Sequence, residues 1–212
     1  MMNVKCLEFN FLPVNTYVVW DETKQAAIID PGCFYPGESD ELQRFISGNG
    51  LEVKLLLNTH LHFDHVFGND FVEKTYNVKA HGHLADNPWI TDIARRLAAF
   101  GIRYQGHVDT VQPENCLNEG DIVRFGSTTL HVMHVPGHSP GSLVYHNRDA
   151  KVLFTGDVLF QNGMGRTDFP DGDGPALVSG IRKKLLVLDP DTVVYPGHGP
   201  ATTIGHELKS FQ

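Results

Sequence analysis

The chain has 212 residues, 41% of them hydrophobic and 20% charged, and a formal net charge of -8, which together are typical of one globular domain spanning residues 1–212. The acidic balance argues against nucleic acid as a partner, and no run approaches the ~18 apolar residues of a membrane span. Three widely spaced cysteines and an N-terminal stretch unlike a secretory signal indicate a cytoplasmic protein without a disulfide framework.

Hydrophobic periodicity predicts strands first, then helices, then strands and helices again. In the first half the expected elements are strands at Val4–Phe9, Thr16–Trp20 and Ala26–Asp30, a helix from Glu38 to about Ser47, a buried strand at Val53–Leu57, a helix near Gly68–Tyr76, a short strand near Val78–Ala80 and a longer helix around Trp89–Phe100. In the second half they are strands at Asp121–Phe125, Thr128–His134, Ser142–His146 and Lys151–Phe154, a helix at Pro175–Leu188, a strand at Thr192–Tyr195 and a short helix after Ala201. Two sheets packed back to back with helices outside would account for this order, as would another α/β arrangement.

The most informative segment follows the expected strand Val53–Leu57 and contains His60, His62, Asp64 and His65 within six positions. In an extended chain residues two apart point the same way, so His60 and His62 can share one metal ion. A turn at Phe63 would direct the other two side chains to the opposite side of the same cavity. Imidazole and carboxylate ligands without a thiolate suit zinc, iron, manganese or cobalt.

Three further ligand-type residues follow predicted strands, each directly after a glycine: His138, Asp157 and His198. Loops at one edge of a sheet are where functional sites are assembled. A single histidine after a strand is more often an ordinary surface residue, but this recurrence favours a metal site.

Other polar residues lack such a pattern. The second His-x-His pair, His81 and His83, is not followed by Asp-His, and we expect it to be structural or to line the cleft. Cys33 is expected to be a free, buried and inert thiol. Asp30 either hydrogen-bonds a ligand loop or is an ordinary turn carboxylate.

The whole pattern resembles the metallo-β-lactamase superfamily, whose hallmark is HxHxDH followed by a distant His, an Asp and a His. That resemblance implies an α/β fold of the αββα sandwich type and two divalent metal ions, zinc first, with iron or manganese as alternatives. It also implies the ligand sets: His60, His62 and His138 for one ion, Asp64, His65 and His198 for the other, and Asp157 as the bridge.

Within the superfamily the chain resembles the glyoxalase II group, through Asn15-Thr16-Tyr17, residues 136–142 and residues 155–160. The closest likeness is to short bacterial hydroxyacylglutathione hydrolase-like proteins without the C-terminal helical domain, which share the stretch Gly165–Phe169. The implied activity is hydrolysis of a small anionic thioester of the S-D-lactoylglutathione type, with glutathione itself left open. The best-known β-lactamases carry Cys where Asp157 stands, which argues against antibiotic hydrolysis.

Metal-assisted thioester hydrolysis suits these histidine and aspartate residues. Two neighbouring metal ions lower the pKa of a shared water and give a hydroxide at neutral pH, and Asp64 is expected to act as a ligand that also orients it. Arg166 is expected to bind a substrate carboxylate, although it could equally be a solvated charge. The alternatives are a mononuclear-iron persulfide dioxygenase, which shares residues 165–169, and a metal-dependent nuclease or lactonase on the same core.

Overall fold

Strands rich in apolar residues on both faces form the first sheet. Its order is β1-β2-β3-β4-β5, and every residue of β2 except Trp20 is buried, because one face meets the second sheet and the other meets helices. Strands β1 to β3 pair antiparallel, whereas β3, β4 and β5 run parallel. The strands are β1 Asn3–Phe9, β2 Val14–Trp20, β3 Gln25–Ile29, β4 Glu52–Leu57 and β5 Ala80–His81.

The second sheet has the order β11-β10-β9-β8-β7-β6. Only the β9–β10 pair is parallel among the pairs of this sheet in residues 2–99 and 101–211, which are the residues that the computed structural model describes. The strands are β6 Ile122–Phe125, β7 Thr128–His134, β8 Leu143–Asn147, β9 Val152–Gly156, β10 Val193–Pro196 and β11 Thr202–Thr203.

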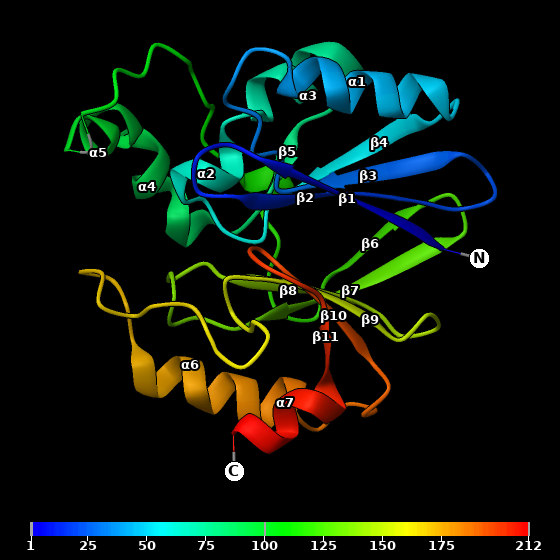
Figure 1. Ribbon diagram of the computed structural model, residues 1–212, viewed down its shortest axis with the longest axis vertical. Helices are drawn as coiled ribbons and strands as arrows, with labels where there is room; N and C mark the ends of the chain where they lie inside the picture. Colours follow the sequence, from blue (N-terminus) through cyan, green and yellow to red (C-terminus); the bar gives the residue numbers. More distant parts are fainter. Residues whose placement is uncertain (1, 100, 212) are drawn as a thin grey trace.

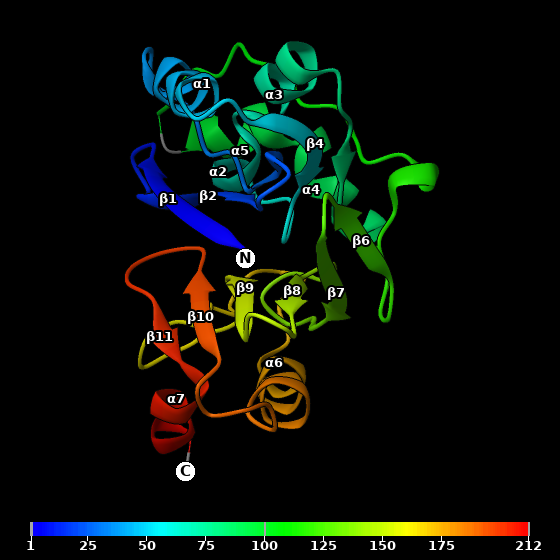
Figure 2. The same cartoon turned by 90° about the vertical axis from the view of Figure 1, so that its right-hand side faces the viewer.

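The two sheets pack face to face and helices cover both outer faces, as Figures 1 and 2 show. The core between the sheets includes Ile29 and Leu57 from the first and Tyr145 and Phe154 from the second. Helices α1 (Glu38–Gly48) and α3 (Asn69–Tyr76) cover the first sheet, whereas α6 (Gly174–Gly180), a π-helical segment η3 (Ile181–Leu185) and α7 (Ile204–Ser210) cover the second. The expected αββα sandwich is confirmed.

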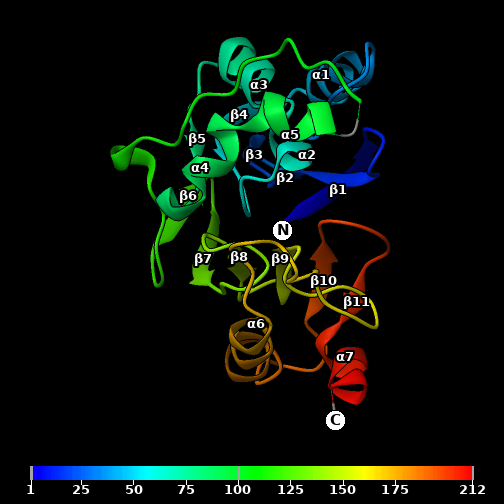
Figure 3. The same ribbon diagram turned by 90° about the vertical axis from the view of Figure 1, so that its left-hand side faces the viewer.

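A further group of short helices packs beside the first sheet (Figure 3). It comprises α2 Phe63–Val66, η1 Leu84–Asp86, α4 Asn87–Thr91 and α5 Ile93–Ala99, followed in the chain by η2 Pro113–Asn115.

Two expected helices differ in the structure. The single helix over Trp89–Phe100 is wrong, because Asp92 has φ -114° and ψ 10° and separates α4 from α5; Phe100 lies outside the described residues. The helix expected at Pro175–Leu188 begins at Gly174 and changes to π-helical hydrogen bonding at Ile181. No helix within residues 2–99 and 101–211 is both long and apolar enough to cross a bilayer.

Candidate metal centre

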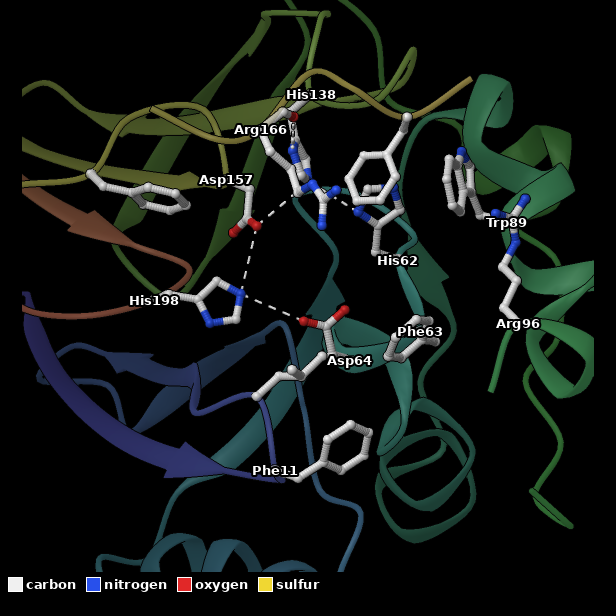
Figure 4. A pocket seen from close by; sticks show the side chains of 13 residues that line it. Phe11, His62, Phe63, Asp64, Trp89, Arg96, His138, Asp157, Arg166 and His198 are labelled. Carbon is white, nitrogen blue, oxygen red and sulfur yellow. Dashed lines mark hydrogen bonds and ion pairs between the residues drawn. The ribbon is translucent and has the colours of Figure 1, made fainter. Parts of the chain in front are cut away.

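Four strand ends bring the ligand-type side chains together, and Figure 4 shows those that face the cleft, which are His62, Asp64, His138, Asp157 and His198. The segment after β4 and the helix α2 carry the HxHxDH residues, and the loop after β7 carries His138. Asp157 directly follows β9, and His198 lies two residues beyond β10. The structure therefore brings together all seven residues that the sequence predicted as ligands.

One group consists of His60, His62 and His138, whose candidate ligand atoms all lie within 4.8 Å of one another. His62 Nδ1 is 2.9 Å from His138 Nε2, and all three side chains are buried. This group could hold one metal ion.

A second group consists of Asp64, His65 and His198, whose candidate ligand atoms also lie within 4.8 Å of one another. The Asp64 carboxylate lies 3.5 Å from His198 Nε2 and 3.7 Å from His65 Nε2. The turn expected at Phe63 is present as the start of α2, and it carries Asp64 and His65 to a second group beside the first.

Asp157 lies between the two groups. Its Oδ2 is 3.5 Å from His138 Nε2 and 3.6 Å from His198 Nε2, and its Oδ1 is 3.4 Å from His65 Nε2. This is the position from which one carboxylate could bridge two ions. The close approach depends on Gly197, since a Cβ there would lie 2.3 Å from Asp157 Oδ1.

The hydrogen-bond pattern fits a metal site. His60 Nε2, His65 Nε2 and Asp157 Oδ1 are buried without a hydrogen-bond partner among the described residues. Such atoms are costly to bury unless something else binds them. The outward nitrogens, by contrast, are engaged: His138 Nδ1 donates to the Arg166 carbonyl at 2.8 Å and His198 Nδ1 to the Pro13 carbonyl at 3.0 Å. Fixing the outer nitrogen in this way orients the inner one toward a metal.

The electrostatics of the centre also favour cations. Burial, followed by the neighbouring histidines, holds the pKa values of His60 and His62 well below the usual range, so these rings are neutral and their lone pairs are available. Burial would lower the pKa of His65 as well, but Asp64, Asp157 and Asp30 raise it to about 10. Burial opposes ionisation of Asp64, yet His65 and His198 lower its pKa to about 2. The carboxylates thus create a field that stabilises positive charge at this point.

Two buried carboxylates support the ligand loops. Asp30 accepts hydrogen bonds from His65 Nδ1 at 3.0 Å and from the Thr59 amide and hydroxyl at 2.8 and 2.6 Å. Asp30, His60 and His65 also satisfy the metal-group distance criterion, but these bonds engage the Asp30 oxygens. Of the two roles open for Asp30, the structure therefore shows hydrogen bonds to the candidate ligand His65 and to its loop.

Asp86 was not singled out from the sequence. It is fully buried, and it accepts hydrogen bonds from the Leu61 amide, the Ser139 hydroxyl and the Gly141 amide. It therefore ties the first ligand segment to the loop that carries His138. A lone Asp between a histidine pair and a helix gives no pattern by which to find it.

The centre opens into a cleft of about 680 Å³. Its walls are mainly aromatic or aliphatic, and they include two arginines. The lining residues besides the ligands are Phe11, Leu12, Phe63, Trp89, Arg96, Phe160, Arg166 and Phe169. The sequence predicted only Arg166 among these, and the structure places it at the cleft with its guanidinium bound to Asp168 through two hydrogen bonds of 2.6 Å.

The second histidine pair lies outside the centre. His81 Nδ1 is 3.0 Å from the Lys79 carbonyl, and the His83 ring stacks on His134 with a centroid distance of 4.4 Å. Cys33 is a free, buried thiol whose pKa burial raises to about 12, as expected for an inert cysteine.

A family model described as the metallo-beta-lactamase superfamily matches residues 9–198. The chain belongs to the metallo-β-lactamase superfamily. The expectation of a metallo-hydrolase of this superfamily is thereby confirmed, and the resemblance to short glyoxalase II-like proteins is confirmed by the relatives.

Among these relatives is the hydroxyacylglutathione hydrolase GloC of Haemophilus influenzae, which is 38% identical over 99% of this chain and 96% of its own. Among solved structures, the BLEG-1 B3 metallo-beta-lactamase has a TM-score of 0.84 at 34% identity and covers 99% of this chain and 97% of its own. The protein TTHA1623 in a di-iron-bound form has a TM-score of 0.84 at 32% identity, with 98% of both chains covered.

Proposed function

We propose that the protein is a thioester hydrolase with a two-metal centre, and that residues 1–212 act as a single hydrolase domain. The observation that carries this proposal is the position of Asp157 between two complete three-residue groups that open into one cleft. His60, His62 and His138 would hold one ion, Asp64, His65 and His198 the other, and Asp157 would bridge them.

When bound, the metal ions supply Lewis acidity that lowers the pKa of water toward neutrality and offsets negative charge on an acyl oxygen. The side chains set the geometry. Asp64 is ionised, because its pKa is held at about 2, so its carboxylate can accept a hydrogen bond from the attacking water. A thiolate leaving group has a pKa of about 8.5 and departs with little protonation. The cleft therefore needs no strong general acid, and its lining supplies none beyond the ligands and the arginines.

The relatives support thioester hydrolysis as the reaction, and they raise two questions to test: which substrate is cleaved and which metal is bound. The similarity to a hydroxyacylglutathione hydrolase covers nearly the whole chain and favours a small anionic thioester of the lactoylglutathione type. The similarity to a B3 metallo-beta-lactamase makes a β-lactam the natural competing substrate. Histidine and carboxylate ligands accept zinc, iron or manganese; we propose zinc, and the di-iron neighbour makes iron the metal to compare.

The experiment measures metal content and turnover on the same preparation. Elemental analysis is combined with assays of S-D-lactoylglutathione, a simple S-acyl thioester and a chromogenic β-lactam, each with and without oxygen. The proposal predicts two metal equivalents and oxygen-independent release of thiol, with turnover of the β-lactam much slower. Turnover of the β-lactam alone would contradict it.

The persulfide dioxygenase alternative is separated by the His198→Ala variant. Because His198 belongs only to the second ligand group, we expect one metal equivalent to be lost and thioester turnover to fall sharply. If the variant instead retains one iron and consumes oxygen with a persulfide at the wild-type rate, the dioxygenase is the correct function.

A further inference from the structure

Two arginines line the cleft, and their surroundings differ. Arg166 is held by both oxygens of Asp168, and its side chain is 63% exposed. Its charge is therefore already neutralised in an exposed position. Arg96, on α5, forms no side-chain hydrogen bond or ion pair with the residues that the structure describes, and its Nε is buried without a partner.

The aromatic ring of Trp89 fixes the position of Arg96. The guanidinium carbon lies 3.6 Å from the centroid of the Trp89 ring, and the ring of His62 contacts the same indole at a centroid distance of 4.2 Å (Figure 4). A guanidinium over an aromatic face is attracted to it and keeps its N–H edge available for a planar acceptor. One aromatic side chain thus separates this cation from a candidate metal ligand.

The acidic residues near Arg96 do not occupy it. Asp92, which immediately precedes α5, pairs with Arg95; it and, more weakly, Asp171 influence the charge of Arg96, but neither lies within ion-pair distance of it. Arg96 as a whole is only partly buried, but its Nε is buried without a partner among the described residues, and a buried unpaired N–H is costly unless a ligand accepts a hydrogen bond from it. Apart from the candidate ligands and Arg166, the other lining residues are apolar, with Phe11, Phe63 and Phe160 among them.

We propose that Arg96, held against Trp89, binds the carboxylate of the substrate, so that the cleft selects thioesters with an apolar middle and an anionic end. For its reaction this inference rests on the proposed thioester hydrolysis, in which water cleaves the C–S bond to give a carboxylic acid and a thiol. The binding of a carboxylate by Arg96 does not depend on that reaction. Arg166 would then shape the rim of the cleft, paired with Asp168, and would not be the principal carboxylate site.

The kinetic test uses the metal-loaded protein and two substrates that differ only in charge: an S-acyl-3-mercaptopropionate and its carboxamide. Arg96→Met keeps the apolar stem over Trp89 and removes the cation. We expect kcat/KM for the carboxylate to fall about 10- to 100-fold, mainly through KM, with less than a threefold change for the carboxamide. The control variant is Arg95→Met, one residue earlier on the same helix, and Arg166→Met is the competing candidate for the carboxylate site.

The binding test needs no turnover. Calorimetry with the S-alkyl thioether of 3-mercaptopropionate and with its carboxamide gives Kd for each variant, and thermal unfolding checks that each is folded. We expect the carboxylate thioether alone to bind about 10- to 100-fold more weakly to Arg96→Met, with Arg95→Met close to wild type and a smaller effect in Arg166→Met than in Arg96→Met.

The two measurements separate the two proposals. Absence of thioester turnover combined with Arg96-dependent binding of the carboxylate would overturn the hydrolase function and support the carboxylate site. The role of Arg96 would be overturned if Arg96→Met weakened binding of the carboxylate and the carboxamide equally. It would also be overturned if Arg166→Met weakened binding of the carboxylate and Arg96→Met did not.

Discussion

Asp157 contacts members of both ligand groups, and no other side chain among the described residues approaches His138 and His198 with the same oxygen. The sequence indicated its importance through the Gly156-Asp157 step after a strand. The physical reason for that step is visible: Gly156 has φ 48°, a conformation that favours glycine, and it turns the chain as β9 ends.

For Asp157→Ala we predict a loss of bound metal and a fall in turnover of several orders of magnitude, because both groups lose a shared anionic ligand. Elemental analysis and steady-state kinetics measure the two effects. Asp168→Ala, which removes an exposed carboxylate eleven residues away that pairs with Arg166, is the matched control and should keep its full metal content. Two metal equivalents and a near-native rate in Asp157→Ala would disprove the bridging role.

Asp30 acts through His65. In Asp30→Asn, an amide replaces a carboxylate that accepts bonds from His65 Nδ1 and from both polar groups of Thr59. We expect metal affinity to fall about 10- to 100-fold, as measured by competition with a chelator. Asp70→Asn removes a partly exposed carboxylate on α3 and should leave affinity unchanged. An unaltered affinity in a folded Asp30→Asn variant would assign Asp30 to the turn alone.

At the scale of elements, strands with long apolar runs bounded by turn residues were predicted well, whereas the two-residue strands were not: β5 was expected at Val78–Ala80 and β11 was missed. The break at Asp92 was not predictable from periodicity, since Ile90 in α4 and Ile93 and Leu97 in α5 all pack into one apolar cluster. The candidate ligands were predictable because each follows a strand. Arg96 was not, because only the tertiary arrangement shows that it stacks on Trp89 and lacks a carboxylate partner.

Asp21 joins elements of the two sheets. It is 2% exposed and accepts hydrogen bonds from Thr23 beside it and from Ser127 and Thr128 in the β6–β7 hairpin. Burial alone would raise its pKa, but these hydrogen bonds outweigh burial and hold the pKa well below its usual range.

The lowered pKa of Asp21 predicts acid sensitivity. A carboxylate with a depressed folded-state pKa stabilises the fold above its unfolded pKa of about 3.9, and this stabilisation is lost as the pH falls toward the folded value. We expect Asp21→Asn to unfold more easily than wild type at pH 7, by roughly 1.5–3 kcal/mol, and the difference to shrink at pH 3. Urea unfolding of chelator-treated protein at both pH values measures it, without interference from metal release. A difference independent of pH would show that the charge of Asp21 is unimportant.

At the scale of the whole molecule, the centre lies where the two sheets meet. The HxHxDH segment follows a strand of the first sheet, whereas His138, Asp157 and His198 follow strands of the second. Metal ions bound here would link the two halves of the sandwich as well as serve the reaction.

Removing the metal should therefore weaken the fold. At a free metal concentration one hundred times Kd, binding to the folded state contributes about 2.7 kcal/mol, which corresponds to a melting-temperature shift of about 5–10 °C for a chain of this size. We expect chelation to lower the melting temperature of wild type by this amount and that of Asp157→Ala by much less, as measured by scanning calorimetry. Identical shifts in the two proteins would show that the stabilising metal binds elsewhere.

The first hairpin and the last ligand loop are joined directly. Val14 forms a β-bridge with His198, and the Asn15 side chain donates hydrogen bonds to the Pro196 and Gly199 carbonyls. On the ribosome these partners are made far apart in time, because more than 180 residues separate them along the chain. The four candidate ligands of the HxHxDH segment are therefore synthesised long before β10 and His198 emerge from the exit tunnel. His60, His62 and His138 are all synthesised at least 60 residues before His198, which the second group lacks until then.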